Sequence, residues 1–187
     1  MSHSKLILIT GRPATGKTYL AQKVAESTHF PVISKDAIKE IMFDTLGIGD
    51  REWSIKLGRS TFALLDYIIE TQLKAGNNVI LESPLNPAFE NEKFQKWQKT
   101  YNFDAVQIIC NTDSDVLFKR FEKRAQSGER HEGHKDSESL DEFRATLAKE
   151  AGEQRIDIQS TVIEVDTTDL GAVDYGGILT QVHDAIL

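Results

Sequence analysis

The feature of this sequence that most constrains its fold is an eight-residue motif near the start of the chain. It reads Gly11-Arg12-Pro13-Ala14-Thr15-Gly16-Lys17-Thr18 and matches the pattern G-x-x-x-x-G-K-S/T at every fixed position. The apolar run 5–10 before it is typical of a buried strand, and residues 18–26 after it are typical of a helix. A strand, a glycine turn and a helix in this order predict a phosphate-binding loop.

The chemistry of a nucleoside triphosphate explains the spacing of this motif. Its glycines let the backbone curl into a ring of N–H donors around a β-phosphate, and the following helix points its positive end at the same phosphate. We expect Lys17 to reach the β- and γ-phosphates and the Thr18 hydroxyl to hold Mg²⁺. The motif predicts nucleotide binding and leaves open what is done with the nucleotide.

The size and charge of the chain exclude several classes of protein. A length of 187 residues predicts a single domain, 1–187, and the net charge of −7 argues against nucleic-acid binding through a broad basic surface. Cys110 is the only cysteine and no apolar leader opens the sequence, so we expect a cytoplasmic protein. No apolar run approaches the roughly 20 residues that span a membrane. We expect a monomer or homodimer.

Short apolar runs alternate with amphipathic segments along the chain. Strands are predicted at 5–10, 31–34, 79–82, 103–110 and 161–166, and helices at 18–28, 35–42, 51–74, 90–100, 113–126, 140–151 and about 178–186. This alternation predicts an α/β fold with a parallel sheet covered on both faces. Because ligands of such sheets bind beyond the carboxyl ends of the strands, we expect the site at that edge.

Two carboxylates are predicted at this edge. Asp36 follows the second strand and opens a helix, where it could act as a general base opposite the γ-phosphate; the alternative is an ordinary acidic residue in a helix's first turn. Glu82 ends the third strand and could contact Mg²⁺ or its waters, although Asp is the commoner acid there. The alternative for Glu82 is a strand-end carboxylate at the solvent boundary.

Three arginines are candidates for a lid over the phosphates. Arg120 and Arg124 lie four apart and therefore share a helix face, and Arg130 follows in the polar run 127–139, which is expected to be an exposed loop. We predict a lid at about 114–138 whose guanidinium groups neutralise charge in the transition state. The alternative is a solvated charged face, because lysines and a glutamate lie between these arginines.

Two histidines in the same polar run, His131 and His134, lie three apart and could ligate a metal. No cysteine lies near them, and the acids around them are ordinary for a polar loop. They are better interpreted as lid residues that meet phosphate or substrate, or as solvent-facing side chains.

Taken together, these residues resemble those of a group of small P-loop kinases. The group includes gluconate kinase, chloramphenicol phosphotransferase, zeta toxin and the kinase domain of polynucleotide kinase. The resemblance rests on residues 11–18, on Ser34-Lys35-Asp36 and on the three lid arginines. The pattern Arg-His-x-Gly-His at 130–134 also resembles that of small bacterial kinases classed as AAA-type ATP-binding proteins.

The resemblance implies a P-loop NTPase fold of three α/β/α layers, with a five-stranded parallel sheet in the order 2-3-1-4-5 and a helical lid. It implies ATP·Mg²⁺ as the phosphate donor and Asp36 as the base that takes the proton of an acceptor hydroxyl. The lid arginines of the family map best onto Arg120 and Arg124. Glu82 departs from the family pattern.

Three functions are compatible with these residues, and the first is favoured. It is the ATP-dependent transfer of phosphate to a hydroxyl of a small metabolite. The second is a kinase for a polynucleotide 5′-hydroxyl or a nucleotide sugar, and the acidic charge of the chain counts against the polynucleotide. The third is an ATPase or switch that acts through a protein partner. The sequence lacks the Asn-Lys-x-Asp motif typical of a GTPase, and nothing in it identifies an acceptor.

Overall fold

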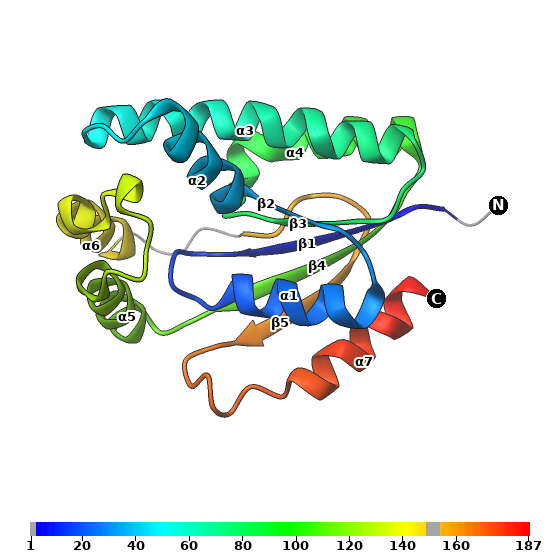
Figure 1. Cartoon of the computed structure of the whole chain (residues 1–187). Helices are drawn as coiled ribbons and strands as arrows, with labels where there is room; N and C mark the ends of the chain where they lie inside the picture. Colours follow the sequence, from blue (N-terminus) through cyan, green and yellow to red (C-terminus); the bar gives the residue numbers. More distant parts are fainter. Residues whose placement is uncertain (1–2, 149–153) are drawn as a thin grey trace.

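The computed structural model describes residues 3–148 and 154–187. Its centre is a parallel sheet of five strands in the order β2-β3-β1-β4-β5, which confirms the expected order (Figure 1). The strands are β1 (Lys5–Gly11), β2 (Val32–Ser34), β3 (Val79–Glu82), β4 (Asp104–Asn111) and β5 (Thr161–Asp166). No helix among the described residues is long and apolar enough to cross a membrane.

Helices cover both faces of the sheet (Figure 1). On one face lie α1 (Lys17–Thr28) and α7 (Tyr175–Ile186), and on the other lie α3 (Arg51–Lys74) and α4 (Pro87–Tyr101), with α2 (Lys35–Leu46) packed against α3. At the carboxyl ends of the strands lie α5 (Ser114–Ser127), two short 3₁₀ helices, η1 (Glu132–His134) and η2 (Asp136–Ser139), and α6 (Leu140–Ala148). The arrangement is a three-layer α/β/α fold.

The central strand β1 shows why this sequence folds into layers. Successive side chains of a strand point to opposite faces, so an apolar run can be buried on both. Leu6 and Leu8 pack with α3 and α4, whereas Ile7 and Ile9 pack with α1 and α7. All four side chains are fully buried, so β1 holds the two halves of the core together.

The bounds of α3, β3 and β5 agree with the prediction, and the other boundaries differ from expectation by a few residues. One prediction is wrong: the run 127–139 is not an exposed loop. It contains η1 and η2, and Gly133, His134 and Ser139 are buried. The predicted helix 140–151 is described only as far as Ala148, and its last residues lie outside the described part of the chain.

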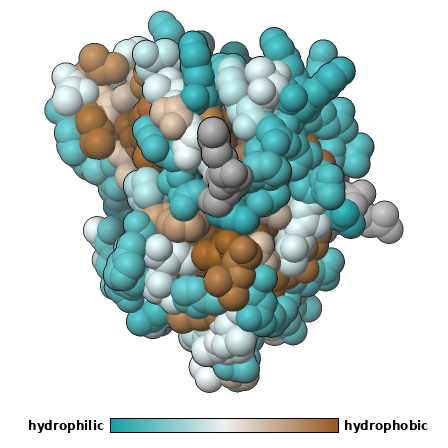
Figure 2. Space-filling view, turned by 90° about the vertical axis from the view of Figure 1, so that its right-hand side faces the viewer, coloured by the Kyte–Doolittle hydropathy of each residue, from teal (hydrophilic) through white to brown (hydrophobic). Residues whose placement is uncertain are grey.

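The two ends of the sheet differ in character. The end where the strands begin carries both chain termini, and its surface is mostly hydrophilic with small hydrophobic patches (Figure 2). At the other end, β1, β2 and β3 finish side by side, with Ile9 and Ser34 both in register with Glu82. That register brings the predicted site residues to one edge.

Candidate active site

The loop between β1 and α1 is shaped by two glycines. A Cβ on Gly11 would lie 2.8 Å from the Cys110 carbonyl oxygen on β4, so only glycine lets the two backbones approach so closely. Gly16 has φ +85°, in the left-handed region that favours glycine, and it directly precedes the first residue of α1. The free N–H groups of the first turn of α1 therefore face the loop, which is the geometry of an anion site.

Lys17 is buried at the start of α1 and lies among oxygen atoms. Its Nζ is 3.5 Å from the Arg12 carbonyl oxygen and 3.8 Å from Glu82 Oε1. Burial lowers the pKa of Lys17, and the nearby carboxylate of Glu82 opposes this effect. The ammonium group is thus held in the loop by weak contacts that a phosphate can replace.

Glu82 lies at the end of β3 and is joined to two hydroxyl groups. Its Oε1 accepts a hydrogen bond of 3.4 Å from Thr18, and its Oε2 accepts one of 2.6 Å from Ser34. Only 1% of Glu82 is exposed, so it is not a carboxylate at the solvent boundary. A buried carboxylate beside two hydroxyl groups is an oxygen-donor set that fits Mg²⁺.

Asp36 occupies the first turn of α2, where its carboxylate contacts two cations. Arg130 Nη2 donates to it at 2.7 Å, and Lys35 Nζ donates at 3.1 Å. Burial acts to raise the pKa of Asp36, but the charges of Lys35 and Arg130 outweigh it and hold that pKa well below its usual range. Asp36 is therefore an ionised carboxylate at the end of the sheet.

The predicted lid arginines are in different surroundings. Arg124 donates to Asp136 at 2.8 Å, and Arg130 lies between Asp36 and Asp136. The Nε groups of Arg124 and Arg130 are buried and have no hydrogen-bond acceptor among the described residues. Arg120 instead donates to the backbone carbonyls of Thr167 and Thr168 at 2.7 and 2.8 Å, so it also fixes the loop after β5.

The two histidines connect this region to α2. His134 Nδ1 faces Arg130 Nη2 at 3.2 Å, and since the guanidinium can only donate, Nδ1 accepts and Nε2 carries the proton toward Glu40, 2.8 Å away. Burial, followed by the charge of Arg130, lowers the pKa of His134 to about 3. His131 lies 3.1 Å from a different acid, Asp44. No group of three metal-ligating side chains occurs in the described part of the chain.

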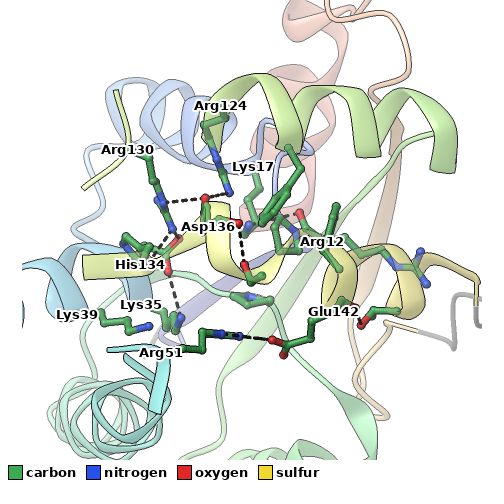
Figure 3. A pocket seen from close by; sticks show the side chains of 17 residues that line it. Arg12, Lys17, Lys35, Lys39, Arg51, Arg124, Arg130, His134, Asp136 and Glu142 are labelled. Atoms are coloured by element: carbon green, nitrogen blue, oxygen red, sulfur yellow. Dashed lines mark hydrogen bonds and ion pairs between the residues drawn. The ribbon is translucent and has the colours of Figure 1, made fainter. Parts of the chain in front are cut away.

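Two cavities meet at these residues. The loop cavity, of about 410 Å³, lies beside Gly16 and Thr18 and extends along α5 to Arg120. The helix cavity, of about 290 Å³, lies between α2, α3, α5 and α6 and is drawn in Figure 3. Four side chains line both cavities: Lys17, Asp36, Arg124 and Arg130.

The sequence analysis missed several side chains of the helix cavity. Lys39 lies one turn after Asp36, a spacing that could have revealed it. Arg51, Asp136 and Glu142 come from three other elements, and no local spacing links them to the motif. Ser34 was part of the predicted motif, but its hydrogen bond to Glu82 follows only from the register of β2 with β3.

The fold and the loop together define a P-loop protein with the α/β architecture of small kinases. The family model described as the AAA domain matches residues 6–150, and the chain belongs to this family. No curated protein matches the chain.

Solved structures with the same fold include three from bacteria. The "putative kinase" of Chloroflexus aurantiacus J-10-fl is 33% identical, with a TM-score of 0.85 and coverage of 99% of each chain. A gluconokinase from Sinorhizobium meliloti 1021 is 14% identical, with a TM-score of 0.53 and coverage of 100% of this chain and 93% of that one. A shikimate kinase from Bacteroides thetaiotaomicron is 20% identical, with a TM-score of 0.53 and coverage of 98% of each. The last two show similarity of fold alone.

Proposed function

We propose that the protein is a kinase that transfers the γ-phosphate of ATP·Mg²⁺ to a hydroxyl group of a small metabolite. The observation that carries this proposal is that Lys17, Asp36, Arg124 and Arg130 line both cavities. Phosphoryl transfer needs a donor and an acceptor in line, with cations and a carboxylate at the point where they meet. A protein that only hydrolyses ATP has no need of the second cavity.

The donor would occupy the loop cavity, with its phosphates at residues 11–18. Lys17 would bind the β- and γ-phosphates, while Thr18 and Glu82 would hold Mg²⁺, which neutralises phosphate charge when it is bound. The contact of 3.4 Å between the Thr18 hydroxyl and Glu82 supports this assignment, because both oxygens are positioned for one cation.

The acceptor would occupy the helix cavity, with its hydroxyl at Asp36. An ionised carboxylate orients that hydroxyl by accepting its hydrogen bond, and it takes the proton as the new oxygen–phosphorus bond forms. Since Arg130 and Lys35 keep Asp36 ionised, the carboxylate is ready to accept the hydrogen bond at neutral pH.

We propose that residues of about 114–138 form the lid of a single domain, 1–187. Arg120, Arg124 and Arg130 would bind phosphate oxygens and neutralise charge in the transition state. The buried Nε groups of Arg124 and Arg130 support this role, because each is a donor for which a phosphate oxygen could be the acceptor. The solved structure that is 33% identical and named as a kinase supports the reaction class. We place the protein in the cytoplasm, where ATP and metabolites occur.

The test is the transfer of labelled γ-phosphate from ATP into a metabolite extract of whole cells. Wild type is compared with Lys17→Ala and Asp36→Asn. We expect a new labelled species that both variants fail to produce. If free phosphate is the only labelled product, and wild type and Asp36→Asn release it equally, the proposal is wrong and a protein partner should be sought instead.

A further inference from the structure

The helix cavity is strongly cationic, although the chain as a whole carries a net charge of −7. Seven cationic side chains and three carboxylates line it. Three of the seven also line the loop cavity, where donor phosphates would engage them. The other four line the helix cavity and not the loop cavity: Arg12, Lys35, Lys39 and Arg51. A cavity built for a neutral polyol has no need of these charges.

Lys39 is the cation whose surroundings are most informative. It is 5% exposed, and its Nζ donates to Ser54 Oγ at 2.9 Å. Among the described residues, no carboxylate lies within ion-pair distance of Nζ. By contrast, Lys35 is paired with Asp36 at 3.1 Å, and Arg51 is paired with Glu142 at 2.6 Å (Figure 3).

A buried ammonium group without a counterion is unfavourable. Burial, followed by the charge of Lys35, lowers the pKa of Lys39 to about 8, even though Asp36 opposes this effect. The protein nevertheless positions the group firmly, because Ser54 accepts from Nζ and donates in turn to the His134 carbonyl oxygen at 3.4 Å. An anion that entered the cavity would satisfy Lys39 and lower the cost of its burial.

We propose that the acceptor is a small hydroxy compound that carries a carboxylate or phosphate group, and that Lys39 binds this group with Arg51 beside it. This inference rests on the proposed kinase function. Asp36 and Lys39 are three apart on α2, which places their Cβ atoms about 5–6 Å apart. The hydroxyl that receives the phosphate and the anionic group therefore lie a few bonds apart on the acceptor.

The test separates acceptors by charge before their identity is known. A metabolite extract freed of macromolecules is passed over an anion-exchange resin at neutral pH, and each fraction is offered to the protein with labelled ATP·Mg²⁺. We expect the labelled product only from the retained fraction. A product from the unretained fraction alone would overturn the anionic acceptor and leave the kinase function standing. No product from either fraction would overturn the kinase function and this inference with it.

Treatment of the retained fraction with phosphatase, followed by removal of the phosphatase, distinguishes the two anions. An acceptor that carries a phosphate monoester is destroyed, whereas a carboxylate acceptor survives. Either result agrees with the proposal and identifies the group that Lys39 binds.

Variants of Lys39 test the assigned residue. Lys39→Met removes the charge, and we expect the amount of retained fraction needed for half-maximal labelling to rise about tenfold or more, as for the loss of one hydrogen bond to a charged group. The KM for ATP should not change. In Lys39→Arg, the amount of retained fraction needed for half-maximal labelling should stay close to that of wild type. Lys56→Met, at an exposed lysine of α3, is the matched control. An unchanged acceptor dependence in Lys39→Met would contradict the role of Lys39.

Discussion

At the scale of single residues, the surroundings of Asp36 give the sharpest prediction. Asp36→Asn keeps the shape of the side chain but removes the charge that faces Arg130 and Lys35. We expect ATP binding to stay nearly unchanged and the transfer rate to fall by about 10²–10⁴, the usual contribution of a positioned base. Equilibrium binding of ATP and labelling of the extract measure the two effects. Asp44→Asn, at an exposed acid of the same helix, should transfer normally, and a normal rate in Asp36→Asn would refute its role as base.

Glu82 makes a second prediction at this scale. Glu82→Gln keeps the shape of the side chain near Thr18 and Ser34 but replaces one acceptor oxygen with an amide NH2 and loses the negative charge that would attract a divalent cation. We expect the Mg²⁺ concentration for half-maximal activity to rise about 10–100-fold, the range seen when partners of a metal site are replaced. A magnesium titration at saturating ATP measures this. Asp166→Asn, at an exposed strand end outside both cavities, should leave the titration unchanged, and an unchanged curve for Glu82→Gln would remove Glu82 from the metal site.

His134 links protonation to stability. Its pKa is lowered from 6.5 to about 3 in the folded protein, so between these values the unfolded chain binds more protons than the native one. Stability therefore falls as the pH drops from 6.5 toward 3. From pH 7 to pH 5, we expect His134 to contribute a loss of about 2 kcal/mol to the free energy of unfolding.

Urea unfolding of wild type and His134→Gln at both pH values measures this contribution. The variant is expected to be less stable at pH 7 but to lose less stability on going to pH 5. His29→Asn, at an exposed histidine, should keep the wild-type difference. Equal pH dependence in wild type and His134→Gln would show that His134 is not held neutral.

The residue scale also shows where sequence reasoning is effective. The placement of Lys17, Thr18, Asp36 and Glu82 at one edge of the sheet could be predicted, because each follows directly from a strand end or a motif of fixed spacing, while their roles in catalysis stay predictions. Arg51 was not predicted, because its position in the cavity depends on how α3 packs against α2 and α6, and long-range packing leaves no periodic trace in the sequence. The partners of Arg120 could not be predicted either. They are backbone carbonyl oxygens of the loop after β5, and every residue type carries such an oxygen.

At the scale of elements, the segment after α5 was misjudged because its composition is polar. Three of its polar residues contact α2 instead of facing solvent. That helix carries Asp36, Glu40 and Asp44 four residues apart on one face, and these acids pair with Arg130, His134 and His131, respectively. The sequence shows both the acidic residues of α2 and the basic residues at 130–134. It does not show that the two groups contact each other, because that depends on how the segment after α5 packs against α2.

Gly133 provides a test of this contact. It lies in η1 so close to α2 that a Cβ would overlap the Phe43 ring, and that ring is buried and cannot move aside. We expect Gly133→Ala to lower the free energy of unfolding by about 1–3 kcal/mol, as for other overpacked sites, as measured by urea denaturation.

A second glycine serves as the control. In Gly58→Ala, the nearest atoms to the new Cβ, Cε and Nζ of Lys39, are 3.7 Å away, which is ordinary contact. That variant should be as stable as wild type or more so, because alanine suits a helix interior. A Gly133→Ala protein with wild-type stability would mean that η1 does not pack against α2 as described.

At the scale of the whole molecule, the fold was the most predictable property and the helix cavity the least. Alternating apolar runs and amphipathic helices determine the layers, and the resemblance to small kinases implied the strand order. The helix cavity collects side chains from five α-helices, from both 3₁₀ helices and from loops, so its charge is a property of the assembled molecule. The net charge of the chain does not reveal this cavity, because an acidic chain here encloses a cationic cavity.

The position of β1 at the middle of the sheet has a consequence for how the protein is made. β1 is synthesised before the other four strands, but its partners are β3, about 70 residues later, and β4, about 100 residues later. Gly11, the first residue of the nucleotide motif, pairs with Cys110 of β4, so this pairing cannot form until about 100 further residues have been added. At about 5–20 residues per second, the nascent chain carries an unpaired strand, with the apolar residues Leu6–Ile9 at its centre, for several seconds. Such a strand is a natural target for a chaperone, and the dependence on distant partners favours slow folding.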